Sequence, residues 1–191
     1  MMKINYVKEY IEKSIRENWN FPALSDYQGK TLLYKDVAQQ ILRIHKIFEV
    51  WGIKQGDKIS LIGRNNSSWA VTYLATISYG AVIVPILPDF APDDVHHIVN
   101  HSDSVLLFVG DSVWENLDDY AMPNLKAVFS LDSSSLLVAR DNKVGRKFQE
   151  LEEPIAKQMK ELTPEKVFYC DIPNSKLGVI SYTSGTTGFS K

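Results

Sequence analysis

The run of residues 181–191 has the composition of a loop that holds a polyphosphate. It reads Ser181-Tyr182-Thr183-Ser184-Gly185-Thr186-Thr187-Gly188-Phe189-Ser190-Lys191 and continues an apolar stretch that we expect to be a strand. Gly185 and Gly188 allow the backbone to bend and to bring its N–H groups close to an anion. Lys191 supplies a compact positive charge for the outer phosphates. The hydroxyl groups that can donate to phosphate oxygens belong to Thr183, Ser184, Thr186 and Thr187.

The spacing separates this run from the Walker A loop of kinases and ATPases. That motif requires a glycine, four further residues and then Gly-Lys-Ser/Thr. Here Gly185 and Gly188 are too close together, and Lys191 does not follow a glycine. Composition alone also allows an ordinary flexible Ser/Gly turn, because such clusters are usually loops.

The order of residues in Tyr182–Lys191 closely resembles the signature phosphate loop of the adenylate-forming (AMP-binding) superfamily. This superfamily includes acyl-CoA synthetases, nonribosomal-peptide adenylation domains and luciferases. The run departs from the common pattern at Ser190, where many members carry a proline that stiffens the loop. The departure therefore affects loop rigidity and leaves the charge unchanged.

Four earlier segments extend the resemblance over nearly the whole chain. They are residues 30–37, 52–59, 79–86 and 97–102, and only 132–171 is without a clear counterpart. Residues 20–37 and 57–109 look more like bacterial long-chain fatty acid–CoA ligases than like peptide-synthetase domains.

The resemblance implies an enzyme that activates a fatty acid with ATP, releases pyrophosphate and passes the acyl group to coenzyme A. It implies that residues 184–188 and Lys191 hold the β- and γ-phosphates. Thr183 would help to bind magnesium, together with a glutamate beyond this sequence. Fixed donors and a metal ion stabilise the charge that builds on the leaving pyrophosphate.

The resemblance also implies that residues 1–191 are the N-terminal portion of an AMP-binding domain, truncated at the phosphate loop. Members of the family carry the adenine pocket, the acyl tunnel and the catalytic C-terminal lysine downstream of that loop. We therefore expect no catalytic residue within this stretch, and we expect it to be inactive when isolated.

Apolar periodicity predicts an α/β fold with a largely parallel sheet and helices on both faces, part of the large N-terminal domain of an adenylate-forming enzyme. Short uninterrupted apolar runs alternate with amphipathic stretches, as parallel sheets require. Strands are predicted at 58–62, 81–86, 104–109, 127–131 and 176–182, and a hairpin at 23–33. Helices are predicted at 4–17, 34–51, 67–79, 92–100, 112–120 and 147–160, and surface loops at 132–135 and 140–146.

Charge and composition favour a cytoplasmic protein and do not imply a nucleic-acid partner. The net charge is −2, and Lys and Arg are scattered without the basic stripe of a nucleic-acid-binding protein. The single cysteine, Cys170, allows no internal disulfide and favours a reducing compartment. The first 17 residues carry charges throughout, so we expect no signal peptide. Residues 65–88 carry no charge, but Gly80 and two prolines favour a helix and strand over a membrane span, and any membrane contact would be peripheral.

Weaker candidates for chemistry have simpler explanations. His97 and His101 are four residues apart, a spacing that could hold zinc. No third ligand is evident, so we expect both to be ordinary surface histidines. Cys170 lacks a nucleophile signature and reads as a structural thiol. The four tryptophans share no periodic face, so we expect them to be packing residues.

Two other functions stay open at this point. The chain could belong to an enzyme that adenylates an amino or aryl acid, since the acyl pocket is not in the sequence. It could also be a non-catalytic N-terminal module, which the reading frame after Lys191 would decide.

Overall fold

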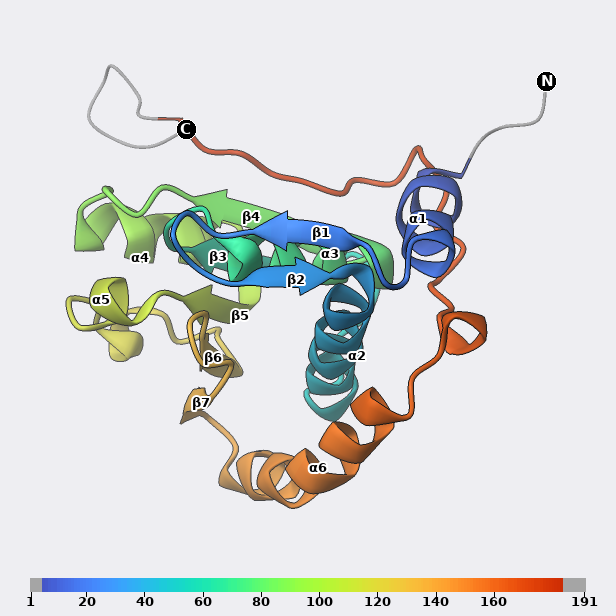
Figure 1. Cartoon of the computed structure of the whole chain (residues 1–191). Coiled ribbons are helices and arrows are strands. Elements are labelled where there is room, and N and C mark those ends of the chain that lie inside the picture. Colours follow the sequence, from blue (N-terminus) through green and yellow to red (C-terminus); the bar gives the residue numbers. More distant parts are fainter. Residues whose placement is uncertain (1–4, 184–191) are drawn as a thin grey trace.

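The computed structural model describes residues 5–183, which fold around a five-stranded sheet (Figure 1). The strand order is β4-β3-β5-β6-β7, and the first four of these are parallel. The bounds are β3 Lys58–Ile62, β4 Val82–Ile86, β5 Ser104–Val109, β6 Ala127–Ser130 and β7 Leu136–Ala139. A separate antiparallel pair is formed by β1 (Pro22–Ser25) and β2 (Thr31–Leu33). The α/β class and the largely parallel sheet are as predicted.

Helices cover both faces of the sheet. The main helices are α2 (Tyr34–Val50), α3 (Ser67–Tyr79), α4 (Pro92–His101) and α6 (Asn142–Lys160). Shorter ones are η1 (Val7–Glu12), α1 (Lys13–Glu17), α5 (Asp111–Trp114), η2 (Asp119–Ala121) and η3 (Pro164–Lys166). Buried residues of α2, α3 and α6 share one cluster with one face of the strands, while α4 packs on the other face.

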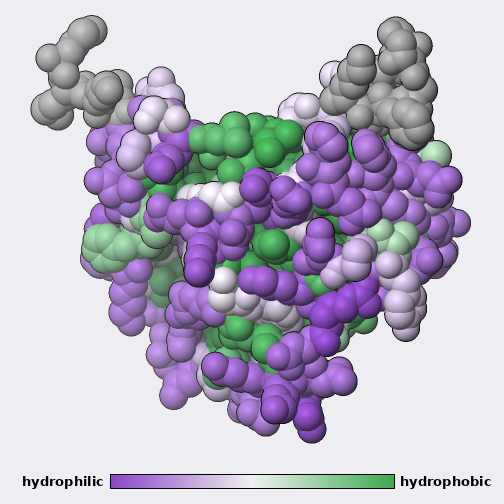
Figure 2. Space-filling model, turned by 180° about the vertical axis from the view of Figure 1, so that it is seen from behind, coloured by the Kyte–Doolittle hydropathy of each residue, from purple (hydrophilic) through white to green (hydrophobic). Residues whose placement is uncertain are grey.

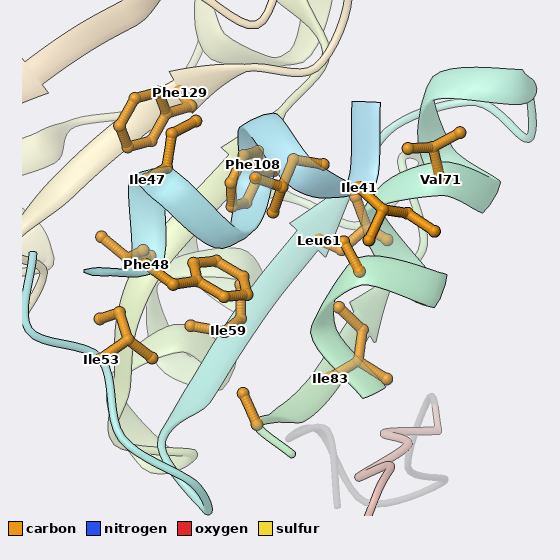
Figure 3. Close-up of a cluster of buried hydrophobic side chains, with 14 of the residues drawn as sticks. Ile41, Ile47, Phe48, Ile53, Ile59, Leu61, Val71, Ile83, Phe108 and Phe129 are labelled. Atoms are coloured by element: carbon orange, nitrogen blue, oxygen red, sulfur yellow. The ribbon is translucent and has the colours of Figure 1, made fainter. Parts of the chain in front are cut away.

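Alternation along each strand divides the core into these two layers. Ile59 and Leu61 face α2 and α3, whereas Ile62 faces α4, as the two-residue period of a strand requires. On the α2 side, Phe48 and Phe129 are fully buried among isoleucines, leucines and further aromatic rings (Figure 3). Burial on both faces explains why these strands read as uninterrupted apolar runs.

The sequence encodes clear starts and stops for α2 and α3. The Asp36 carboxylate accepts the Leu33 N–H at 2.8 Å before α2, and Asn66 accepts the Trp69 N–H at 2.8 Å before α3. Gly80 ends α3 with φ +86°, a conformation that glycine adopts without strain. The helix-then-strand interpretation of residues 65–88 is thus confirmed. None of the helices within residues 5–183 is long and apolar enough to cross a membrane.

Two predictions around residues 132–146 were incomplete. Residues 132–135 form a turn as expected, but residues 136–139 form the antiparallel strand β7, which the apolar pattern did not reveal. The predicted loop 140–146 was wrong from Asn142 onward, because α6 begins there and not at Lys147. Asp141 caps that start by accepting the Lys143 N–H at 2.8 Å.

Three other elements differ from expectation. The helix predicted at 112–120 is the single turn α5 followed by the separate turn η2. The N-terminal helix opens with the π-helical turn η1 and becomes regular only in α1. Residues 176–182 form no full strand within the described chain, because they pair with β4 only at a single parallel bridge between Val179 and Ile83.

Candidate functional site

The strand order places a switch point between β3 and β5. From β3 the chain moves through α3 to β4 on one side, and from β5 it moves to β6 on the other side. The loops that leave the carboxyl ends of β3 and β5 therefore diverge to opposite faces of the sheet. In open parallel sheets this is where a crevice forms and where ligands bind.

A cavity of about 490 Å³ occupies this position. Its lining comes from the segments that follow β3, β4, β5 and β6, so four consecutive carboxyl ends meet there. The residues are Gly63, Arg64, Asn66, Pro88, Asp89, Phe90, Pro92, Gly110, Ser112, Val113, Asn116, Leu117 and Asp132. The volume and the mixed polar and apolar lining suit a small-molecule ligand.

Two glycines keep the end of the sheet open at this cavity. The Gly110 N–H donates to the Ile62 carbonyl at 2.9 Å, which brings the ends of β5 and β3 together. A Cβ on Gly63 would lie 2.6 Å from Leu131 Cδ2, and a Cβ on Gly110 would lie 3.6 Å from Gly63 Cα. A side chain at Gly63 would force the Leu131 side chain to shift.

Hydrogen bonds fix the acidic side of the cavity. Asp132 accepts the Asp111 N–H at 2.8 Å, and the Ser130 hydroxyl donates to the Asp111 carboxylate at 2.6 Å. These contacts attach the start of α5 to the end of β6. Arg64 is exposed on the rim and brings a guanidinium group to the same mouth.

The strap, which we define as residues 161–183, leads from α6 to the predicted phosphate loop. It runs along the upper side of the molecule past α1 and then beside β4 (Figure 1). The Ile83 N–H donates to the Gly178 carbonyl at 2.9 Å, and the Ile180 N–H donates to the Ile83 carbonyl at 3.0 Å. Because this pairing is parallel, the strap travels toward the same sheet edge as the ends of β3 and β5.

The last described residues of the strap continue this course. Tyr182 packs with the α4 side of the core, and its hydroxyl shares a 2.7 Å hydrogen bond with His101 Nδ1. Burial raises the pKa of Tyr182, with the Asp103 carboxylate adding to the effect. Thr183 follows and is exposed. The other predicted site residues, Ser184, Gly185, Thr186, Thr187, Gly188 and Lys191, lie outside the described residues.

The structure shows where the weaker candidate residues from the sequence lie. The His97 and His101 rings lie 5.5 Å apart on α4, and no group of three potential metal ligands exists within residues 5–183. Cys170 is exposed on the strap. Trp51 packs edge-on against Phe129 at 5.0 Å, which supports the packing role expected for the tryptophans.

His45 is a half-buried polar residue that the sequence analysis did not single out. Its Nε2 hydrogen bonds to the Ala75 carbonyl at 2.9 Å, and its ring lies against Tyr79 and Tyr169. Burial lowers the pKa of His45 from 6.5 to about 4, so the side chain is neutral at pH 7. The sequence offered one signal for its burial, which is its position beside the apolar face of α2. His45 directly follows Ile44 and lies three residues before Phe48.

A doubly wound, mostly parallel sheet with a cavity outside its switch point defines a ligand-binding α/β domain. Residues 11–191 match the family model of the AMP-binding enzymes, and the chain belongs to this family.

Curated relatives match over most of the chain. The chain is 28% identical over 160 residues to the long-chain-fatty-acid–CoA ligase of Thermus thermophilus, covering 83% of this chain and 26% of that relative. It is 26% identical over 169 residues to long chain acyl-CoA synthetase 1 of Arabidopsis thaliana, covering 85% of this chain and 24% of the relative. The chain thus spans about a quarter of the length of these relatives.

Solved structures share the fold. The anthranilate CoA ligase AuaEII, in complex with anthranoyl-AMP, superposes with a TM-score of 0.77 at 14% identity, covering 100% of this chain and 34% of the other. The luciferase-like enzyme of the mealworm Zophobas morio superposes with a TM-score of 0.70 at 17% identity, covering 99% and 42%.

Proposed function

We propose that this chain is the N-terminal part of a ligase that activates a fatty acid with ATP and transfers the acyl group to coenzyme A. The observation that carries the proposal is the run Tyr182–Lys191, which follows a strap that travels toward the ligand-binding edge of the sheet. Family membership supports the adenylating class, and the names of the two curated relatives support a fatty acid as substrate.

The proposed site uses donors that suit a polyphosphate. Hydroxyl groups and Lys191 would bind the β- and γ-phosphates, and no carboxylate occurs in residues 181–191 to repel them. Thr183 would contribute its hydroxyl to a magnesium site completed by a glutamate outside this sequence. The metal, when bound, would supply positive charge to the leaving pyrophosphate. The role of the chain's own residues is to hold that group in a fixed orientation.

Carboxylate-dependent ATP–pyrophosphate exchange tests the proposal in the full natural protein that contains this chain. Palmitate, acetate, benzoate and an amino-acid mixture serve as separate substrates. We expect palmitate to drive exchange, and we expect Lys191→Ala to reduce the rate about 10²- to 10³-fold, the usual effect of removing one fixed donor to a developing charge.

The other outcomes separate the alternatives. Exchange with benzoate or amino acids alone would keep the adenylation mechanism and overturn the fatty acid. No exchange with any acid would reject the enzyme and favour a non-catalytic module.

A further inference from the structure

The strap is joined to the N-terminal helix through a buried carboxylate. Glu12 is 6% exposed, and its Oε2 accepts the backbone N–H of Tyr169 at 2.7 Å, across a sequence separation of 157 residues. A carboxylate that accepts a backbone N–H forms one of the stronger hydrogen bonds in proteins. This bond therefore fixes one residue of the strap relative to η1.

Two cations lie beside the Glu12 carboxylate. Lys8 Nζ lies 2.8 Å from Oε2, and Arg16 Nη1 lies 3.5 Å from Oε1. The three residues are spaced at i−4, i and i+4, so they share one helical face. A buried carboxylate needs such compensation, because an unpaired charge in this position would be strongly destabilising.

Further contacts extend the junction on both sides of Tyr169. The guanidinium of Arg16 lies 5.2 Å from the centre of the Phe168 ring. Asn5 donates to the Asp171 carboxylate and to the Ile172 carbonyl, the latter at 3.3 Å. The Tyr6 N–H donates to Asn174 Oδ1 at 3.0 Å. Polar groups of the N-terminal segment thus follow the strap for several residues.

Apolar burial anchors Val167 and Tyr169 in the core but contributes less to their neighbours on the strap. Phe168 is 67% exposed and Leu177 is 59% exposed. Between Tyr169 and the bridge at Val179, Ile172 is the apolar side chain that packs against the core. The Glu12 contact and the β4 bridge are consequently two separate attachment points, and the predicted phosphate loop begins a few residues beyond the second.

We propose that Glu12 is a positioning residue, which fixes the register of the strap against the N-terminal helix and so sets where the phosphate loop starts. The effect of Glu12 on phosphate binding rests on the proposed function. The register itself does not, since it is defined by contacts between described residues, among which the Glu12–Tyr169 hydrogen bond is the buried one between the strap and η1.

The first test is hydrogen exchange in the full natural protein, followed in peptides that cover residues 165–183. Glu12→Leu removes the acceptor, and we expect amides of 169–180 to exchange about 10- to 100-fold faster, the effect of losing a hydrogen bond to a charged group. Glu12→Gln keeps an oxygen acceptor and should restore part of the protection. Unchanged exchange in Glu12→Leu would overturn the proposal.

A matched control separates position from charge. Glu9→Gln makes the same charge change on the same helical segment, where Glu9 pairs with Lys13 at 3.5 Å and both side chains are half exposed. We expect this variant to leave the hydrogen exchange of the strap amides unchanged. Slow hydrogen exchange of the amides in β3, β4 and β5 shows that a variant is folded. Only variants that pass this check are compared.

The second test is the pyrophosphate-exchange assay. We expect Glu12→Leu to raise the KM for ATP about tenfold while the KM for the acid stays constant, with partial rescue by Glu12→Gln. Equal increases in both KM values would contradict a role at the phosphate loop. If the wild-type protein activates no acid, the proposed function fails. Hydrogen exchange of the strap amides still decides whether Glu12 fixes the register of the strap.

Discussion

The central sheet and the strap hold their residues in place by different means. In the sheet, side chains such as Ile59, Leu61 and Phe129 are fully buried and position is set by packing on both faces. In the strap, Val167 and Tyr169 are buried, but Phe168 and Leu177 are largely exposed, and hydrogen bonds to η1 and β4 contribute to setting the position. Figure 2 shows apolar surface on the upper side between the two termini, where Figure 1 places the strap.

The difference indicates which part of the molecule can move without unfolding the rest. Close-packed interiors resist small shifts because each displaced side chain leaves a void or a clash. A segment with few buried apolar contacts opens locally at a much lower free energy than the core. The predicted phosphate loop is therefore attached to the more adjustable of the two regions.

The largest effect should come from emptying the core. Phe129 is fully buried and contacts the rings of Trp51, Phe108 and Phe148. Phe129→Ala should lower the free energy of unfolding by about 3–5 kcal/mol, because it removes apolar burial and leaves a cavity. Urea unfolding measures the change. A loss below about 1 kcal/mol would mean that the core is not close-packed.

An intermediate effect is expected where the two regions meet, at His45. Its folded-state pKa of about 4 is below the unfolded value of 6.5, so between these pH values the unfolded chain binds a proton that the folded chain does not. Stability should fall as pH drops from about 6.5 to 4, by on the order of 3 kcal/mol in all.

Unfolding measured at several pH values gives this slope directly. His45→Gln should lower stability at pH 7, because the imidazole ring packs against Tyr79 and Tyr169. The same variant should have a flatter pH profile. If the native protein and the variant show parallel profiles, His45 is not the origin of the pH dependence.

The smallest effect should come from the same Phe-to-Ala change on the strap. Phe168 is largely exposed, and its main contact is the guanidinium of Arg16. Phe168→Ala should cost no more than about 1 kcal/mol, the range of an exposed cation–π contact. Urea unfolding in parallel with Phe129→Ala tests the contrast, and similar losses would show that the strap belongs to the packed core.

Apolar period and capping residues predicted most of the fold. The runs at 58–62 and 104–109 match β3 and β5, and the run between Asn66 and Gly80 matches α3, because burial on both faces and helix ends leave local signals. Strand β7 was missed because it is only four residues long and lies at the edge of the sheet. An edge strand need not be buried on both faces, so its sequence need not be an uninterrupted apolar run. The start of α6 was placed late because the cap at Asp141 lies in a polar stretch.

The candidate site was less predictable than the fold. Residue order alone indicated the phosphate loop, and the roles of Thr183 and of residues 184–191 remain predictions. The cavity at Gly63 and Gly110 depends on which strands are neighbours, which no single segment encodes. Glu12 offered only a weak signal, the cations four residues away on each side, because its partner is a backbone N–H far along the chain.

The separation of 157 residues between Glu12 and Tyr169 also has a consequence during protein synthesis. At about 5–20 residues per second, the ribosome needs roughly 8–30 s between adding the first and the second of these residues. The N-terminal helix therefore waits without its partner while the strands of the sheet are being made. This contact can therefore form only late in biosynthetic folding, after all five strands of the sheet have been made.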